Sequence, residues 1–239
     1  MKNEVNSKAR QTVTSIGTRK ESSLHRSLKF SYSGSGGSVE TAAGAYICDA
    51  CTGDGELIEI QTGSFGPLKE KVKSLCKENK VRIIHPIIIQ KTIELYDTQG
   101  HLLRKRKSPR KGSLWDIFNA LVYASELITQ KNLIIELAVI DAVEKRVDDG
   151  AGSYRRKGIS ITDRFLDTWH HSVILKNLKD YHQFTPYKKS EFFTAQELAK
   201  KAGVKAELTR KTLYVLTKAG LVEQTGKQGR AYLYRRKNS

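Results

Sequence analysis

The spacing of hydrophobic residues predicts an ordered series of helices and strands in the first part of the chain. Leu24, Leu28 and Tyr32 recur every four positions, as on the buried face of a short helix that glycines at 34–37 would end. Later apolar runs either alternate with polar residues or are nearly continuous, and both patterns are typical of strands. In order, the pattern predicts a helix from residue 21, strands at 39–43, 45–51 and 56–61, a helix at 67–78 and a strand at 81–89.

Two features of these segments add local geometry. The Thr-Gly-Asp-Gly sequence at 52–55 supplies the positive φ values of a tight hairpin between the second and third strands. Pro86 cannot donate a ladder hydrogen bond, so it predicts a sheet edge or a bulge. The pattern then predicts a hairpin with strands at 93–96 and 101–104, an amphipathic helix at 113–127 and a strand at 133–141.

Composition and pattern divide the chain into four segments. Residues 1–20 are rich in Lys, Arg, Ser and Thr and have no hydrophobic period, which predicts a mobile basic arm. Residues 21–145 predict an α/β (α+β) domain with a mixed sheet. A helical connector is expected at 146–190, with a helix beginning near Ile161. Residues 191–239 form a second, smaller domain.

The last segment has the pattern of a winged helix-turn-helix domain. Thr194 and Glu197 form a capping box that starts one helix, a second helix spans 206–218, and a hairpin covers 221–234. In such a domain the second helix would enter the major groove of DNA and the hairpin would lie along the backbone. Many winged helices bind protein instead, so a protein partner stays open.

The net charge of the chain indicates the kind of partner that it binds. The 239 residues carry a formal net charge of +17, which favours a polyanion such as nucleic acid over solubility alone or a ribosomal or membrane-surface partner. The longest apolar run, at 133–140, is far shorter than the roughly 20 residues that cross a bilayer. No signal segment is visible, and three cysteines argue against a disulfide framework, so we expect a cytoplasmic protein without membrane contact.

Two acidic residues stand out on the predicted hairpin strands. Asp49 lies in the first strand, and alternation in the second places Leu57, Glu59 and Gln61 on one face. Neighbouring carboxylates in an apolar sheet repel each other and lose hydration, a cost of the order of several kcal/mol that a bound divalent cation offsets. Asp49 and Glu59 therefore predict a site for Mg²⁺ or Mn²⁺, the hard cations that carboxylate oxygens prefer.

The order of these elements resembles the core of the PD-(D/E)xK nuclease superfamily, which includes restriction endonucleases and Holliday-junction resolvases. The spacing of Asp49, nine further residues and Glu59-x-Gln61 adds to the likeness. The stretches ESSLHRSLK, DACTGDGELIEIQTGSF, PLKEKV, RIIHPI and RKSPRKG more closely resemble an uncharacterised bacterial family with this core and a C-terminal winged helix. The resemblance covers most of the chain from Glu21 onward and implies a restriction-endonuclease-like αβββαβ core.

This resemblance also implies roles for individual residues. Asp49 and Glu59 would coordinate the metal, and Glu21 would stand in for the helix-borne acidic residue of resolvases. From its spacing alone, Glu21 is equally well explained as a solvated residue favoured by the dipole of the first helical turn.

One position departs from the superfamily motif. Gln61 stands where the usual lysine positions the attacking water and stabilises developing negative charge, and an amide donates hydrogen bonds without carrying charge. Some members of the superfamily also have Gln here, and in others a lysine on the following helix has this role. Lys69 and Lys71 are the candidates for it. A decayed site that no longer cuts is the alternative.

Basic residues gather in two further regions. Residues 104–111 contain six Lys and Arg, a density that phosphates or solvent must accommodate, so a solvated loop is the alternative interpretation. More basic residues lie on the second helix and the hairpin of the last domain. The candidate nucleic-acid-binding residues are Arg104, Lys105, Arg106, Lys107, Arg110, Lys111, Arg210, Lys211, Tyr214, Lys227 and Arg230.

Other motifs are better explained by packing. Cys48 and Cys51 have CxxC spacing, but no second pair exists, and strand alternation predicts opposite faces, which favours core positions. His170 and His171 fall in the predicted helical connector, where adjacent residues cannot face the same way, so we interpret them as structural. No GxGxxG or GxxxxGK[ST] sequence indicates a nucleotide cofactor.

The sequence and the resemblance together predict a metal-dependent DNA endonuclease, or a nuclease-like protein, that hydrolyses phosphodiester bonds and binds DNA through the winged helix. The first alternative is a non-catalytic DNA-binding regulator whose degenerate core serves dimerisation. A homodimer is therefore a further expectation. A protein–protein adaptor in a defence or repair assembly is the third hypothesis.

Overall fold

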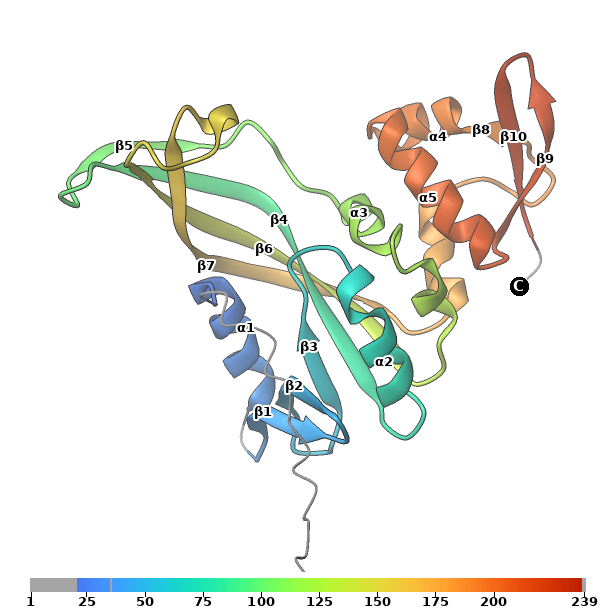
Figure 1. Ribbon diagram of the computed structural model, residues 1–239. Coiled ribbons are helices and arrows are strands. Elements are labelled where there is room, and N and C mark those ends of the chain that lie inside the picture. The colour runs from blue at the N-terminus through green and yellow to red at the C-terminus, as the bar shows by residue number, and fades with distance from the viewer. Residues whose placement is uncertain (1–20, 35, 238–239) are drawn as a thin grey trace, which may run out of the picture.

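The largest unit of the protein is a seven-stranded mixed sheet (Figure 1). The computed structural model describes residues 21–34 and 36–237, so the expected basic arm at 1–20 lies outside the described residues. The strands are β1 Ser38–Ala43, β2 Tyr46–Cys51, β3 Leu57–Ile60, β4 Val81–Tyr96, β5 Leu102–Lys107, β6 Leu133–Asp148 and β7 Ile159–Leu175. Their order in the sheet is β1-β2-β3-β4-β6-β7, and β5 pairs with β4.

Apart from the short 3₁₀ helix η1 (Gly66–Leu68) just before α2, the elements up to β4 follow the predicted order of one helix, three strands, one helix and one strand. Helix α1 (Ser23–Ser33) precedes an antiparallel β1-β2-β3 meander, and α2 (Lys69–Leu75) crosses over to β4, which therefore runs parallel to β3. The two helices lie on opposite sides of the sheet near β3 (Figure 1). Alternation along β3 divides the core accordingly, because Ile58 and Ile60 pack with α1 whereas Leu57 packs with α2.

Strand β4 is longer than predicted and has two neighbours along one of its edges. Its first residues pair with β3 and its last residues pair with β5, so the predicted strand at 93–96 is the end of β4. Pro86 lies between these two pairings. Because β3 ends at Ile60, opposite Ile84, no strand on that side requires an N–H from Pro86. The ladder with β6 shifts register just beyond, between Ile88 and Gln90, as the proline predicted.

The predicted helical connector is wrong. Residues 159–175, where a helix was expected from Ile161, form β7, which pairs antiparallel with nearly the full length of β6. A short 3₁₀ helix, η5 (Leu178–Phe184), follows. Ile, Val and Thr recur through β7 and favour strand, and the long β6 ladder accepts their backbone hydrogen bonds. His170 and His171 therefore lie on a strand, and His170 Nε2 is 3.2 Å from Asp141 Oδ2.

The predicted single helix at 113–127 is also divided. It consists of η2 (Leu114–Asp116), α3 (Ile117–Leu121) and η3 (Ser125–Thr129), whose apolar residues enter the main core as the pattern indicated. All helices in the described part of the chain are short, and none of them has the length and hydropathy to cross a membrane.

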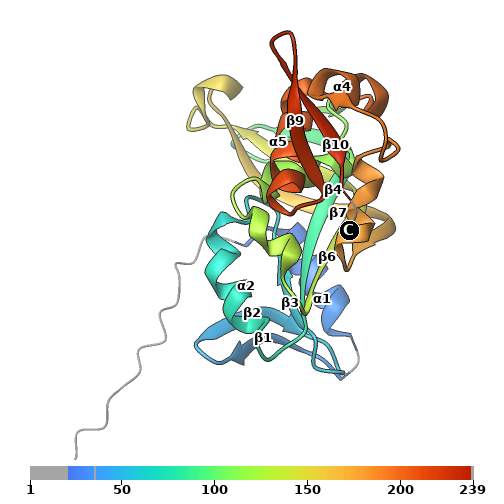
Figure 2. The ribbon, with the colours of Figure 1, turned by 90° about the vertical axis from the view of Figure 1, so that its right-hand side faces the viewer.

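The C-terminal unit contains two helices and a small antiparallel sheet. Its elements are β8 Phe193–Thr194, α4 Ala195–Ala202, α5 Ala206–Lys218, β9 Val222–Gln228 and β10 Ala231–Arg236, with strand order β8-β10-β9. The predicted capping box forms, since the Thr194 side chain accepts from Glu197 N. Leu213 and Leu216 of α5 share a core cluster with Phe118 of α3, and α5 contacts η2, α3 and η3, so this unit packs on the helical segment that follows β5 (Figure 2).

Candidate functional site

Asp49 lies where the pairing of β2 with β3 stops. The last antiparallel pair beside it is Ala50 with Ile58, and beyond this pair Asp49 Oδ2 accepts a hydrogen bond of 2.8 Å from the main-chain N–H of Ile60. In β1, the facing residue Glu40 has a φ of +52°, which is uncommon for a residue with a side chain. The carboxylate of Asp49 therefore takes the place of a main-chain acceptor at the end of this ladder.

The same irregularity changes how the cysteines face. Cys48 belongs to the core cluster on the α2 side, and Cys51 packs against the same cluster, so the predicted opposite faces are wrong. The prediction of core packing is confirmed, and all three cysteines are free. Burial, together with the nearby Glu59 carboxylate, raises the pKa of the Cys48 thiol to about 12. A raised pKa favours the neutral thiol, which is a weaker nucleophile than the thiolate.

On the α1 side, two cations join Glu21 to Asp49. His25 Nδ1 lies 2.5 Å from Glu21 Oε1, and His25 Nε2 lies 3.3 Å from Asp49 Oδ2 and 3.0 Å from the carbonyl oxygen of Ile60. Lys29 Nζ is 3.0 Å from Glu21 Oε1 and 4.0 Å from Asp49 Oδ1. The structure thus brings Glu21 to the site, but through His25 and Lys29.

Charge explains how these groups ionise. Burial lowers the pKa of His25, but hydrogen bonds and charge from Asp49 and Glu21 outweigh it and raise the pKa above its ordinary value. Burial likewise acts to raise the pKa of both carboxyls, yet His25 and Lys29 hold the two pKa values below the ordinary range. The shifts therefore favour the charged form of all four groups, with His25 and Lys29 between the two carboxyls.

On the α2 side, Lys71 holds Glu59. The Glu59 residue is only 3% exposed, and Lys71 Nζ lies 2.5 Å from its Oε1 and donates to the carbonyl oxygen of Ile47 at 2.7 Å. Burial raises the pKa of Glu59, Lys71 opposes this effect, and the charge of Asp49 adds to the rise. The two acidic residues are therefore electrostatic neighbours, although α1 holds one and α2 holds the other.

The remaining predicted catalytic residues lie apart from this pair. The side-chain amide of Gln61 donates to the carbonyl oxygen of Ser64 at 2.5 Å. Lys69 forms an ion pair with Glu126 and does not reach Glu59. Of the two candidate lysines on the helix after β3, only Lys71 joins the acidic residues.

The donor chemistry fits the expected metal, with one restriction. Carboxylate oxygens of Asp49 and Glu59 suit Mg²⁺ or Mn²⁺. Among residues 21–34 and 36–237, however, no three His, Cys, Asp or Glu side chains gather as a metal-binding group. A divalent ion would therefore have to compete with His25 and Lys71 for these oxygens.

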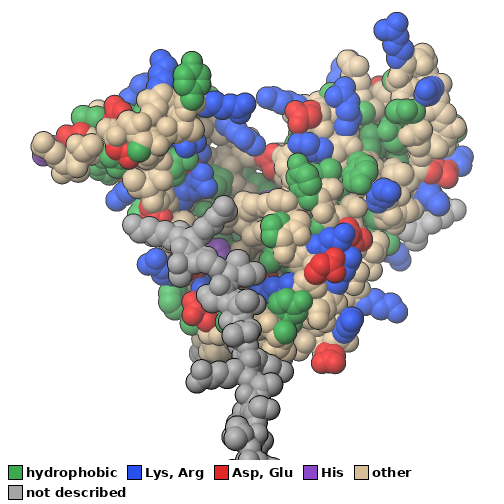
Figure 3. Space-filling model, viewed as in Figure 1, with side chains coloured by type: hydrophobic (Ala, Val, Ile, Leu, Met, Phe, Trp, Pro, Cys, Tyr) green, Lys and Arg blue, Asp and Glu red, His purple; other side chains and the backbone are tan. Residues whose placement is uncertain are grey.

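A groove lined with basic side chains lies beyond this site. Figure 3 shows Lys and Arg side chains on both walls of a hollow between the β5 end of the sheet and the C-terminal unit. One cavity there, of about 630 Å³, lies between Arg110 and Lys111 on one side and Lys205 on the other. A second, of about 250 Å³, is lined in part by His85. His85 Nδ1 donates to the carbonyl oxygen of Gln61 at 2.6 Å, so the end of β3 adjoins this cavity wall.

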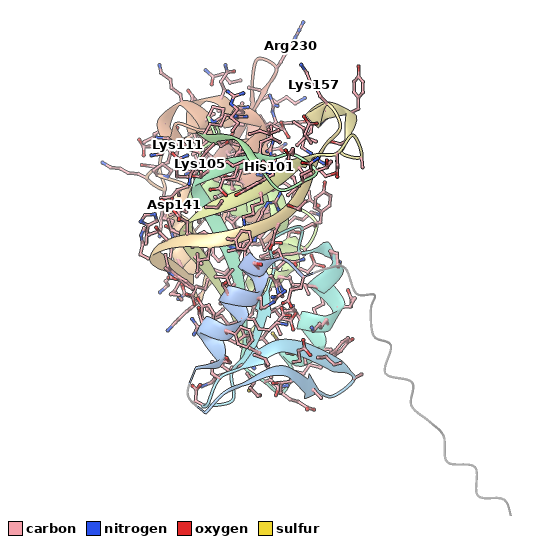
Figure 4. The ribbon with its side chains drawn as sticks, turned by 90° about the vertical axis from the view of Figure 1, so that its left-hand side faces the viewer. His101, Lys105, Lys111, Asp141, Lys157 and Arg230 are labelled. Carbon is pink, nitrogen blue, oxygen red and sulfur yellow. The ribbon has the colours of Figure 1, made fainter. Side chains whose placement is uncertain are left out.

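Most of the predicted nucleic-acid-binding residues are exposed. Figure 4 shows three of them, Lys105, Lys111 and Arg230, in the half of the molecule away from α1 and α2. Of these, Lys105 pairs with Glu94 across the ladder at 3.0 Å. The others that reach solvent are Arg104, Arg106, Lys107, Arg110, Arg210, Tyr214 and Lys227.

Lys211, another candidate nucleic-acid-binding residue, is the exception, because it is only partly exposed. Its Nζ donates to Asn119 Oδ1 at 2.9 Å, which ties the C-terminal unit to the large sheet domain, and it also pairs with Glu207 at 3.0 Å. The helical period alone could not show that α5 packs on α3 at this position. Arg210 and Tyr214 remain on the exposed face of the helix.

Sequence reasoning missed the cations that hold the acidic residues. Glu21, His25 and Lys29 follow one another at intervals of four, so the helical period could have identified the two cations as neighbours of Glu21. Glu144 and Arg164, described below, lie in the middle of long strands. No spacing along the chain could have paired them, because only the β6–β7 ladder brings them together.

Comparison with known proteins identifies one family and one relative of this chain. No solved structure matches the chain. A relative from Treponema pallidum (strain Nichols), described as "Uncharacterized protein", is 31% identical over 222 residues, which cover 92% of this chain and 87% of the relative. A family model described as "Domain of unknown function (DUF8091)" matches residues 22–176, from α1 to the end of β7. The chain belongs to this family, the domain of unknown function DUF8091.

Proposed function

We propose that the protein is a metal-dependent nuclease that binds DNA in the basic groove and hydrolyses a phosphodiester bond at Asp49 and Glu59. The observation that carries the proposal is that Lys71 contacts Glu59 while Asp49, at the end of the β2-β3 pair, is close enough for its charge to raise the pKa of Glu59. The order of elements around them is the one that the resemblance to the PD-(D/E)xK superfamily led us to expect.

The role of each residue follows from its charge and position. Asp49 and Glu59 would hold Mg²⁺ or Mn²⁺, which would supply a water of lowered pKa and neutralise charge on the phosphate. Lys71 carries the positive charge that Gln61 lacks and can stabilise the negative charge that develops on the phosphate. His25 and Lys29 hold Asp49 and Glu21 ionised, which keeps the acidic ligands ready for a cation.

The basic surfaces support DNA as the partner. The arrangement of α4, α5 and the β9-β10 hairpin is compatible with a winged helix-turn-helix, with Arg210 and Tyr214 on the exposed face of α5 and Arg230 at the hairpin tip. Arg110 and Lys111, at the end of the basic segment 104–111, lie on the other wall of the groove. Opposed basic walls suit a duplex, because both can contact phosphates at once.

A cleavage assay tests the proposal. Supercoiled plasmid, single-stranded DNA and four-way DNA would be incubated with the full chain and Mg²⁺ or Mn²⁺. We expect cleavage of at least one substrate that needs the ion and falls about 100-fold in D49N and E59Q. Salt-dependent DNA binding without any cleavage would reject the catalytic role, and cleavage unchanged in both variants would reject these residues.

One observation favours a second function, a non-catalytic DNA-binding protein. Both acidic residues already have protein cations as partners, namely His25, Lys29 and Lys71, as in a structural ion network. In that case D49N and E59Q would change the free energy of unfolding without changing DNA affinity. Divalent ions would then affect neither the unfolding free energy nor the DNA affinity.

A further inference from the structure

Glu144 is the centre of an ion cluster that the acidic site does not use. Its residue is fully buried (0% exposed) in the middle of β6. Lys91 Nζ lies 2.9 Å from its Oε2, Arg164 Nε donates to the same oxygen at 2.8 Å, and Arg146 Nη2 donates to Oε1 at 2.5 Å. Three cations from three adjacent strands therefore share one carboxylate.

The charge of this cluster does not balance. One carboxylate offsets one of the three cations, and the side chains of Lys91, Arg146 and Arg164 are only 24%, 18% and 41% exposed. Partial burial removes water from these cations, and the single carboxylate does not compensate all three of them for this loss of hydration. An anion that binds beside Lys91 and Arg164 would supply the missing charge.

A cavity lies where such an anion would bind. Lys91, Arg110 and Arg164 all line the cavity of about 250 Å³. One carboxylate, Asp116, lines it as well, with its Oδ1 3.7 Å from Arg110 Nη2, so the cations outnumber the anions there. A water molecule occupies about 30 Å³ of liquid, so the cavity has room for a phosphate group and several waters. Arg146 does not line it and serves to hold Glu144.

The loop that carries Arg110 is fixed against β4. Ser108 N donates to the carbonyl oxygen of Lys91 at 2.7 Å, and Gly112 N donates to that of Ile88 at 3.0 Å. A Cβ at Gly112 would lie 2.4 Å from the Ile88 carbonyl oxygen, so the close approach requires glycine. These two bonds place the backbone of Arg110 over the cavity before any ligand arrives.

We propose that Lys91, Arg110 and Arg164 form a binding site for one phosphate group, with Glu144 as the residue that positions Lys91 and Arg164. The inference rests on the proposed function in one respect, since it takes the phosphate from a nucleic-acid strand bound in the groove. The phosphate is either a backbone phosphate or the terminal phosphate of a strand end.

Binding measurements on the full chain test the site. Fluorescent duplexes of one sequence, with a 5′-phosphate or a 5′-hydroxyl, would be titrated at several salt concentrations against wild type, R164Q and K91Q. The matched control is K77Q, an exposed lysine outside the cavity. We expect R164Q and K91Q each to weaken binding about tenfold and to reduce the salt slope by about one, and K77Q to have no effect.

The outcomes separate the two sources of phosphate. A loss confined to the 5′-phosphorylated duplex identifies a terminal phosphate, and an equal loss on both duplexes identifies a backbone phosphate. Duplex affinities of R164Q and K91Q equal to that of K77Q would overturn the site.

Calorimetry with inorganic phosphate, in the absence of nucleic acid, makes the site testable apart from the proposed function. We expect wild type and K77Q to bind one phosphate and R164Q to lose it. This result in a protein without DNA affinity would overturn the proposed function and keep the site. Phosphate binding that is equal in wild type and R164Q would overturn the site even if DNA is cleaved.

Discussion

Lys71 Nζ lies 2.5 Å from Glu59 Oε1, whereas Lys69, two residues earlier on the same chain segment, pairs with Glu126. The difference predicts unequal roles in cleavage for these two lysines of α2. K71Q removes the cation that contacts the buried Glu59, so we expect cleavage to fall about 100-fold. The measurement is the rate of plasmid cleavage in Mg²⁺ or Mn²⁺.

The matched control for this prediction is K69Q. Lys69 is about one third exposed and its ion pair is remote from Asp49, so we expect a cleavage rate within about threefold of wild type. Equal loss of activity in both variants would contradict the assignment of Lys71 and would indicate that α2 acts through general basic charge.

Glu144 should be essential to stability. E144Q leaves the partly buried cations Lys91, Arg146 and Arg164 without their carboxylate, so we expect the free energy of unfolding to fall by about 3 kcal/mol at pH 7. Urea unfolding would measure this change. The control is E223Q, which breaks a partly exposed pair with Arg235 and should cost below about 1 kcal/mol.

The same residue gives a pH dependence of defined sign. Burial raises the pKa of Glu144, but hydrogen bonds from Lys91, Arg164 and Arg146 outweigh burial and lower the pKa from 4.5 to about 2. A lowered carboxyl pKa stabilises the fold above the unfolded value and loses this effect as the pH falls through the folded value. The stability difference between wild type and E144Q should therefore be constant above pH 4.5 and shrink toward pH 2. A difference that grows on acidification would contradict the ion cluster.

Gly112 should be sensitive to a single methyl group. In G112A the new Cβ would meet the Ile88 carbonyl oxygen at 2.4 Å, which forces the loop from β4. We expect a loss of about 2 kcal/mol in the free energy of unfolding and weaker DNA binding. The control is G63A, because a Cβ at Gly63 has no atom within 4 Å. Thermal unfolding and DNA titration of both variants check the prediction, and equal behaviour would contradict it.

The hairpin tip of the C-terminal unit should contribute to DNA affinity through its positive charge and not to the choice of DNA. Lys227 and Arg230 are exposed, and they flank a turn at Gly229 with a φ of +58°. If both contact phosphates, the double variant K227A/R230A should reduce the salt dependence of log Kd by about two without changing which DNA is preferred. Titrations at several salt concentrations measure this slope, and an unchanged slope would exclude the tip from the interface.

Local patterns in the sequence predicted much of the fold. The period of Leu24 and Leu28 identified α1, and the alternation in β3 placed Glu59 on the same face as Leu57, the face that α2 covers in the structure. Both features depend on neighbours within a few residues. The prediction failed at β7, because the preference of residues 159–175 was decided by β6, which lies across the sheet and supplies the partner for their backbone groups.

The candidate acidic site, like the fold, could be predicted only in part from the sequence. Asp49, Glu59 and Lys71 could be identified from strand pattern and resemblance. In the structure Lys71 contacts Glu59, and the charge of Asp49 raises the pKa of Glu59. The cations on Asp49 could not be assigned, because the contact of His25 with Asp49 depends on how α1 packs over the end of the β2-β3 pair.

The proposed cation site at Asp49 and Glu59 is best tested by calorimetry, with Mn²⁺ titrated into the native wild type and D49N proteins. We predict that wild type binds Mn²⁺ and that D49N loses this binding while its unfolding remains cooperative. Absence of Mn²⁺ binding in wild type, or equal binding in D49N, would contradict a cation site at Asp49 and Glu59 and leave the ion network as a structural feature.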